Sequence, residues 1–260
     1  ERKYGDCKDK STLAVGLLRA AGIPAYVALL DSSTGAGIEP DLPGMGIFNH
    51  AIVYVPGAPD LWLDPTDLDL RLGVVSPANQ GRYALVARAE TKELMLTPEM
   101  TAAQNHIIET REFFLSELGR AKVTETSEVH GVFDREYRGE LGSLENQKLL
   151  DSLKGYVEYT YGQTKSMRAS TGNRQDLKTP FRLNVEMEEA QRGASDRAEA
   201  AVGIFPSQIF TRLPQVLREE EKKQEKEGHA PKPARTQDYY LSQPFHNEWR
   251  YRIQIGRAHV

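Results

Sequence analysis

The chain has 260 residues, of which 39% are hydrophobic and 27% are charged, an ordinary composition for a globular protein with a sizeable core. Its formal net charge of -4 at pH 7 offers no electrostatic footprint for nucleic acid, and no apolar run reaches the roughly 18 residues of a membrane helix. A single cysteine excludes an internal disulfide framework, and no Cys/His spacing resembles a zinc site.

The single cysteine, Cys7, lies at the start of a predicted helix. Asp6 is a good N-cap residue, Asp9 follows at capping-box spacing, and leucines recur at helical spacing until Gly22 ends the helix. Cys7 therefore occupies the first helical position, where free backbone N–H groups and the helix dipole favour an anion. A thiol in this setting is a candidate nucleophile, because the thiolate form is favoured. The alternative is a small, inert hydrophobic residue, the commoner role of a lone cysteine.

The residues after this helix predict three strands. A buried apolar run covers residues 25–30, and alternating runs cover residues 48–55 and 61–64. Residues 31–46 are rich in Gly, Pro and Ser and predict a long loop. Residues 79–86 predict a connector that enters a further strand.

The turn between the second and third strands sets a register that brings a histidine and an aspartate together. We expect Val55 to face Leu61 across the turn. Asp64 then lies opposite Ile52 and becomes a diagonal neighbour of His50, with Cα atoms about 7–8 Å apart. A slip of one residue would turn the two side chains to opposite faces.

Each of these residues also has a simpler interpretation. A histidine in an apolar strand is more often a satisfied core residue than a catalytic one. Asp64 precedes a proline, which is typical of a turn, and Asp67 competes with it for any carboxylate role. Cysteine at a helix start, followed by histidine on one strand and aspartate on the next, is much less expected by chance and favours a catalytic set.

Three blocks of sequence together resemble the transglutaminase-like superfamily: residues 5–10 (GDCKDK), 48–55 (FNHAIVYV) and 62–66 (WLDPT). The resemblance covers residues 1–86 and is closest to bacterial multidomain members. It implies an α+β fold whose papain/transglutaminase-like core packs a helix on an antiparallel sheet, here truncated at its N-terminus. It also implies that Cys7 is the nucleophile, His50 its base and Asp64 the residue that orients the histidine. Export to the periplasm is a further implication of the family, whereas the residues alone leave localisation open.

A Cys–His–Asp set performs acyl transfer from an amide. The thiolate attacks the carbonyl carbon, and His50 protonates the departing amine. The acyl group then passes to water, as in a peptidase or amidase, or to a primary amine, as in protein cross-linking. We expect a peptide or protein substrate, no nucleic-acid partner, and neither a metal nor an organic cofactor. The alternative is a binding or assembly module that retains the fold and the three residues but catalyses no reaction.

The second part of the chain contains alternating or apolar-dense runs with Thr, Val, Ile and Phe, which predict a β-rich domain with one helix. Thr97-Pro98 marks the boundary, so the predicted domains are residues 1–97 and 98–255. A helix capped by Ser143 carries a leucine-rich face, and residues 218–227 have no apolar face and predict a solvated helix or linker. The predicted strands are residues 106–117, 122–130, 181–187, 199–205 and 248–255.

The last residues, 256–260, match one translated frame of a common sequencing adapter. We interpret them as a sequence scar and the chain as a fragment of a longer open reading frame.

Overall fold

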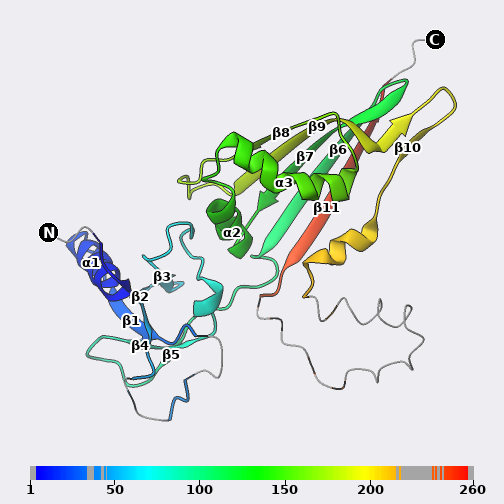
Figure 1. Cartoon of the computed structure of the whole chain (residues 1–260). Helices are drawn as coiled ribbons and strands as arrows, with labels where there is room; N and C mark the ends of the chain where they lie inside the picture. Colours follow the sequence, from blue (N-terminus) through cyan, green and yellow to red (C-terminus); the bar gives the residue numbers. More distant parts are fainter. Residues whose placement is uncertain are drawn as a thin grey trace.

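The computed structural model of the chain describes residues 4–33, 38–41, 44, 46–214, 217, 236, 238, 241 and 243–256. In these residues the chain forms an α+β fold with two β-sheets that share no strand pair (Figure 1). The predicted α+β class is confirmed. The solvated helix or linker expected at residues 218–227 lies outside the described residues, as do residues 257–260 of the expected scar.

Helix α1 (Cys7–Ala20) begins where the sequence predicts. The Asp6 side chain accepts the backbone N–H groups of Lys8 and Asp9 at 2.9 and 3.1 Å, and the Asp9 side chain accepts the N–H of Asp6 at 3.2 Å. This reciprocal capping box fixes the first turn, and with it the position of Cys7.

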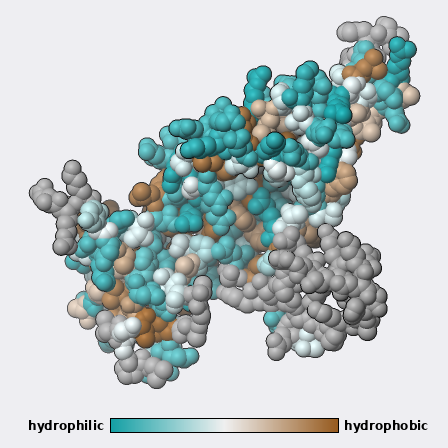
Figure 2. Space-filling view, viewed as in Figure 1, coloured by the Kyte–Doolittle hydropathy of each residue, from teal (hydrophilic) through white to brown (hydrophobic). Residues whose placement is uncertain are grey.

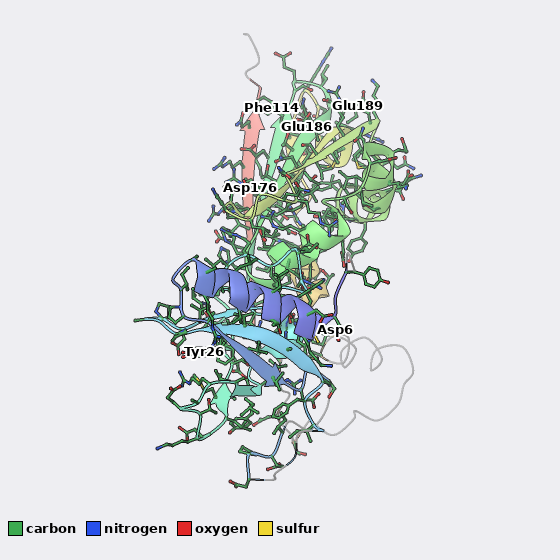
Figure 3. The ribbon with its side chains drawn as sticks, turned by 90° about the vertical axis from the view of Figure 1, so that its left-hand side faces the viewer. Asp6, Tyr26, Phe114, Asp176, Glu186 and Glu189 are labelled. Carbon is green, nitrogen blue, oxygen red and sulfur yellow. The ribbon has the colours of Figure 1, made fainter. Side chains whose placement is uncertain are left out.

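The first sheet has five antiparallel strands in the order β3-β2-β1-β4-β5. Their bounds are β1 (Tyr26–Leu30), β2 (His50–Val55), β3 (Leu61–Leu63), β4 (Tyr83–Val86) and β5 (Met95–Leu96). Helix α1 packs on the face that carries Val53 and Val55, and Figure 3 shows it lying across the sheet from Asp6 onward. The opposite face carries Ile52, Tyr54 and Trp62. His50 is the first residue of β2 and has the same position in the strand alternation as Ile52 and Tyr54.

The second sheet has six strands, five in the order β10-β9-β7-β6-β11 and β8 paired with β9. Their bounds are β6 (His106–Leu115), β7 (Gly119–Val129), β8 (Ser166–Thr171), β9 (Phe181–Ser195), β10 (Ala200–Val202) and β11 (His246–Ile255). All pairs are antiparallel except that of β11 with β6, which is parallel. Hydrophilic residues cover most of the visible face of this part of the molecule (Figure 2).

Two α-helices accompany the second sheet, so the expectation of one helix was wrong. Helix α2 (Val132–Glu140) was missed because its buried side chains include the charged pair Asp134 and Arg138, which breaks the apolar periodicity. Helix α3 (Asn146–Tyr161) begins after Glu145 rather than at Ser143, and no side chain caps it. Its predicted apolar face is confirmed and packs on the sheet through Leu149, Leu153, Val157 and Tyr161.

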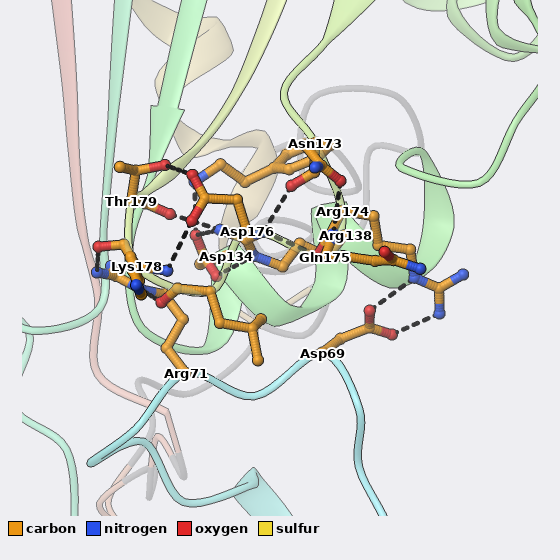
Figure 4. A network of polar contacts seen from close by, with 12 residues as sticks. Asp69, Arg71, Asp134, Arg138, Asn173, Arg174, Gln175, Asp176, Lys178 and Thr179 are labelled. Carbon is orange, nitrogen blue, oxygen red and sulfur yellow. Dashed lines mark hydrogen bonds and ion pairs between the residues drawn. The ribbon is translucent and has the colours of Figure 1, made fainter.

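Side chains from the loop after β3 join the first sheet to the second. Arg174 donates Nε and Nη2 hydrogen bonds to the two carboxylate oxygens of Asp69, both at 2.7 Å (Figure 4). Arg71 donates to the backbone oxygens of Leu177 and Lys178 at 3.0 and 2.9 Å. These contacts hold the loop after β3 against the second sheet, and that loop begins at Asp64.

In the described part of the chain, no helix has both the length and the apolar character needed to cross a membrane. The domain boundary at residues 97–98 stays a prediction.

Candidate functional site

His50 and Asp64 meet because of the register of β2 and β3. Val55 pairs with Leu61 and Val53 with Leu63, so continuing the register by one residue sets Asp64 opposite Ile52, as predicted. His50 Nε2 and Asp64 Oδ2 are 2.8 Å apart, with side chains 17% and 6% exposed. The predicted register is confirmed, and it produces a hydrogen bond that is largely shielded from water.

The Asp64 carboxylate is held by several donors at once. Its Oδ1 accepts the backbone N–H of Thr66 at 2.9 Å and the Thr66 hydroxyl at 2.6 Å. Its Oδ2 accepts from Asn79 Nδ2 at 2.9 Å in addition to its bond with His50. The turn role suggested by the following proline is also present, since Asp67 N–H donates to the Asp64 carbonyl oxygen at 3.3 Å. Asp64 thus starts a turn and binds the histidine.

The hydrogen bond with Asp64 raises the pKa of His50 above its usual value, although burial acts in the opposite direction. The charge of Asp64 and a hydrogen bond with the Cys7 side chain add to this increase. Burial alone would raise the pKa of Asp64, but the hydrogen bonds from His50 and Thr66 outweigh it, and the net pKa is lowered. Both shifts favour an imidazolium–carboxylate pair.

Cys7 is a free thiol, partly buried, at the first position of α1. Its side chain lies close enough to His50 to form the hydrogen bond that contributes to the raised pKa of the imidazole. Nε2 of His50 is bonded to Asp64, so Nδ1 is the ring nitrogen that this bond leaves free for another partner. The structure therefore brings the three candidate side chains together around one imidazole.

Asp67, the alternative carboxylate, has other partners. It accepts a hydrogen bond of 2.8 Å from Arg135 Nε and one of 3.1 Å from the Asp69 backbone N–H. The carboxylate that bonds to the histidine is that of Asp64.

A cleft of about 600 Å³ lies beside His50 and Asp64. The loop after β3 and the short helix η1 (Pro77–Asn79) form most of its lining, and Cys7 is not part of that lining. Arg135 of α2 and Arg174 of the loop between β8 and β9 complete it. The C-terminal half of the chain thus contributes a wall to a site whose main residues come from the first hundred residues.

The sequence did not assign a role to Asn79 or to the two arginines. Asn79 lies in the predicted connector, and its bond to Asp64 spans 15 residues. Arg174 and Asp69 are 105 residues apart. No local periodicity marks such contacts, and the only available signal was a polar turn placed shortly after the candidate acid.

No cluster of three or more His, Cys, Asp or Glu side chains suited to a metal ion occurs in the described residues. Comparison of the chain with protein-family models, with curated proteins and with solved structures finds no match. The resemblance to the transglutaminase-like superfamily therefore stays a prediction, and the function must be argued from the site itself.

Proposed function

We propose that the chain is a cysteine-dependent acyl transferase or hydrolase that acts on amide bonds of a peptide or protein. Its first sheet and α1 would form a papain/transglutaminase-like core. One observation carries the proposal: His50 bonds to Asp64 at 2.8 Å through Nε2 and also contacts the side chain of Cys7. A nucleophile, a base and a group that orients the base are the three parts of such a site.

The roles follow from the hydrogen-bond directions. Nε2–H of His50 donates to Asp64, which fixes the tautomer and leaves the Nδ1 lone pair to accept the thiol proton. The resulting thiolate of Cys7 attacks the amide carbonyl carbon, and a tetrahedral oxyanion forms. The backbone N–H of Cys7, in the first turn of α1, is not used by the helix ladder and is a suitable donor to that oxyanion. One such donor lowers the barrier by about 3–4 kcal/mol.

Collapse of the tetrahedral intermediate breaks the C–N bond. His50, now an imidazolium, gives its Nδ1 proton to the departing amine, and a thioester remains on Cys7. Water or a primary amine then takes the acyl group and restores the thiol.

The test compares the wild-type chain with Cys7→Ala and His50→Ala. Each protein is assayed for cleavage of labelled peptide mixtures and for incorporation of a fluorescent primary amine into casein. We expect both variants to lose turnover while their circular dichroism spectra stay unchanged. Asp67→Asn is the matched control, since Asp67 lines the same cleft but has Arg135 as its partner.

Alkylation of Cys7 gives a test that requires no substrate. As Cys7 is the only cysteine, iodoacetamide reports on that thiol alone. We expect the wild-type chain to be alkylated faster at neutral pH than His50→Ala, because the imidazole of His50 accepts the thiol proton. Equal alkylation rates in the two proteins, together with absent turnover, would favour the alternative of a binding or assembly module.

A further inference from the structure

Asn79 is buried directly behind the candidate acid. It is the last residue of η1 and is 2% exposed. Its Nδ2 donates a 2.9 Å hydrogen bond to Asp64 Oδ2, the same oxygen that bonds to His50 Nε2 at 2.8 Å. Asn79 therefore acts on the oxygen that orients the imidazole, and not on the oxygen that Thr66 holds.

The Asn79 amide has one orientation that this environment accepts. Turning it over would set its carbonyl oxygen against the Asp64 carboxylate, which offers no donor while ionised. In the orientation present, Asn79 Oδ1 is buried and has no partner among the described residues. A buried acceptor without a donor lowers the stability of the fold, so stability alone does not explain why an asparagine occupies this position. The hydrogen bond from its Nδ2 to Asp64 gives a reason for it.

The turn that carries Asn79 is anchored independently of Asp64. The Thr97 hydroxyl donates to the Asn79 carbonyl oxygen at 2.6 Å. The neighbouring Gln80 donates from Nε2 to the Val75 carbonyl oxygen at 2.7 Å and accepts the Met100 N–H at 3.1 Å. The amide of Asn79 is thus presented by a fixed piece of backbone, as required of a group that holds another side chain in place.

We propose that Asn79 is a positioning residue that, together with Thr66, clamps the Asp64 carboxylate so that Oδ2 faces His50 Nε2–H. The inference rests on the proposed function and deepens it. With Oδ1 held by Thr66 and Oδ2 by Asn79, rotation of the carboxylate is blocked from both sides. The imidazole then keeps the tautomer that directs Nδ1 to Cys7.

The first measurement needs no substrate. Side-chain NMR of ¹⁵N-histidine protein follows the tautomer and the titration of His50, assigned by comparison with His50→Gln. In Asn79→Ala we expect a smaller fraction of the Nε2–H tautomer and a His50 pKa that falls toward the ordinary value of about 6.5. Asn146→Ala is the control, because it makes the same substitution at an exposed asparagine at the start of α3, away from Asp64. We expect its His50 signals to match the wild type.

The second measurement uses whichever amide substrate the wild-type chain turns over. Asn79→Ala should lower kcat by about 10- to 100-fold with KM within about 2-fold, since misorientation acts on the chemical step. Asn146→Ala should change kcat by less than about 3-fold.

An unchanged His50 tautomer and pKa in Asn79→Ala would overturn the clamp. A rise in the His50 pKa would also overturn it, because it would mean that Asn79 only withdraws charge from the carboxylate. A wild-type chain without turnover would contradict the proposed function but would leave the NMR result to decide the role of Asn79.

Discussion

Ser11 Oγ donates a hydrogen bond of 2.9 Å to the carbonyl oxygen of Ala51. Ser11 is fully buried one turn after Cys7 in α1, and Ala51 follows His50 in β2. This bond therefore links the helix that carries the thiol to the strand that carries the imidazole. Because the two groups belong to different elements, their separation depends on how firmly the helix is held on the strand.

Removing this link should loosen both the fold and the site. For Ser11→Ala we expect a free energy of unfolding lower by about 1–2 kcal/mol, because a buried hydrogen bond is lost. We also expect a slower alkylation of Cys7. Urea titration and the iodoacetamide assay measure the two effects. Thr12→Ala is the control on the exposed side of the same turn and should change stability by less than about 0.5 kcal/mol. Equal effects of the two substitutions would contradict a special role for Ser11.

Asp64 should contribute to turnover by selecting the tautomer of His50. In Asp64→Asn the side chain loses its charge, and the preference of His50 for Nε2–H is lost with it. We expect kcat to fall by about 10³- to 10⁴-fold, the size seen when the orienting acid of a triad is neutralised. Stopped assays with the best amide substrate measure this loss. A fall in Asp67→Asn as large as that in Asp64→Asn would contradict the assignment of Asp64.

The raised pKa of His50 predicts how stability depends on pH. A group whose pKa is higher in the folded state stabilises the fold below its unfolded value, about 6.5 for histidine, and loses that contribution as the pH rises through the folded value. The free energy of unfolding of the wild type should therefore exceed that of His50→Gln most below about pH 6.5, with the difference shrinking at higher pH. Urea titrations from acidic to alkaline pH measure it. A difference that does not vary with pH would contradict the ion pair.

The contribution of Asp64 to the free energy of unfolding should depend on pH in the opposite direction from that of His50. Its pKa is lowered in the folded state, so its contribution is present above the unfolded value of about 3.9 and is lost as the pH falls through the folded value. Acid unfolding of Asp64→Asn should therefore show a weaker dependence on pH below about 4 than that of the wild type.

Arg138 organises the segment that presents Arg174 to Asp69. It pairs with Asp134 at 2.7 Å, both side chains being 1% exposed, and it also donates to the backbone oxygens of Asn173, Arg174 and Thr179. Arg138→Ala leaves a buried carboxylate without its cation and should lower the free energy of unfolding by about 3–5 kcal/mol. Arg138→Lys should lose less, since it keeps the charge but not the planar fork.

Chemical denaturation measures these differences, with Arg168→Ala on the exposed side of β8 as the control. A loss in Arg138→Ala no larger than that of the control would contradict the role of Arg138.

The first sheet was predictable because its signals are local. The capping box at Asp6 and Asp9, the alternation in β2 and the short turn before β3 lie within a few residues of what they determine. Together they fix the start of α1 and the pairing of His50 with Asp64. The second sheet followed local rules less closely. Helix α2 buries a charged pair rather than an apolar stripe, and α3 starts without a side-chain cap.

The remaining parts of the site depend on contacts that no short window contains. Asn79 reaches Asp64 from a separate turn, and Arg135 reaches Asp67 across 68 residues. A propensity or a periodicity describes what a segment does by itself. It does not say which distant loop will supply a hydrogen bond to a carboxylate.

The parallel pairing of β11 with β6 bears on how the protein is made. It pairs Tyr251 with Arg111, which lies 140 residues earlier in the chain. The other neighbour of β6 is β7, which follows it directly in the sequence. While a nascent chain is still being translated, β6 has an open edge, and Arg111 lacks the Trp249 ring that lies 4.0 Å from it in the finished fold. Closure of this edge therefore waits until residues 246–255 have been synthesised, and any shorter product leaves the edge of β6 open to pairing with other chains.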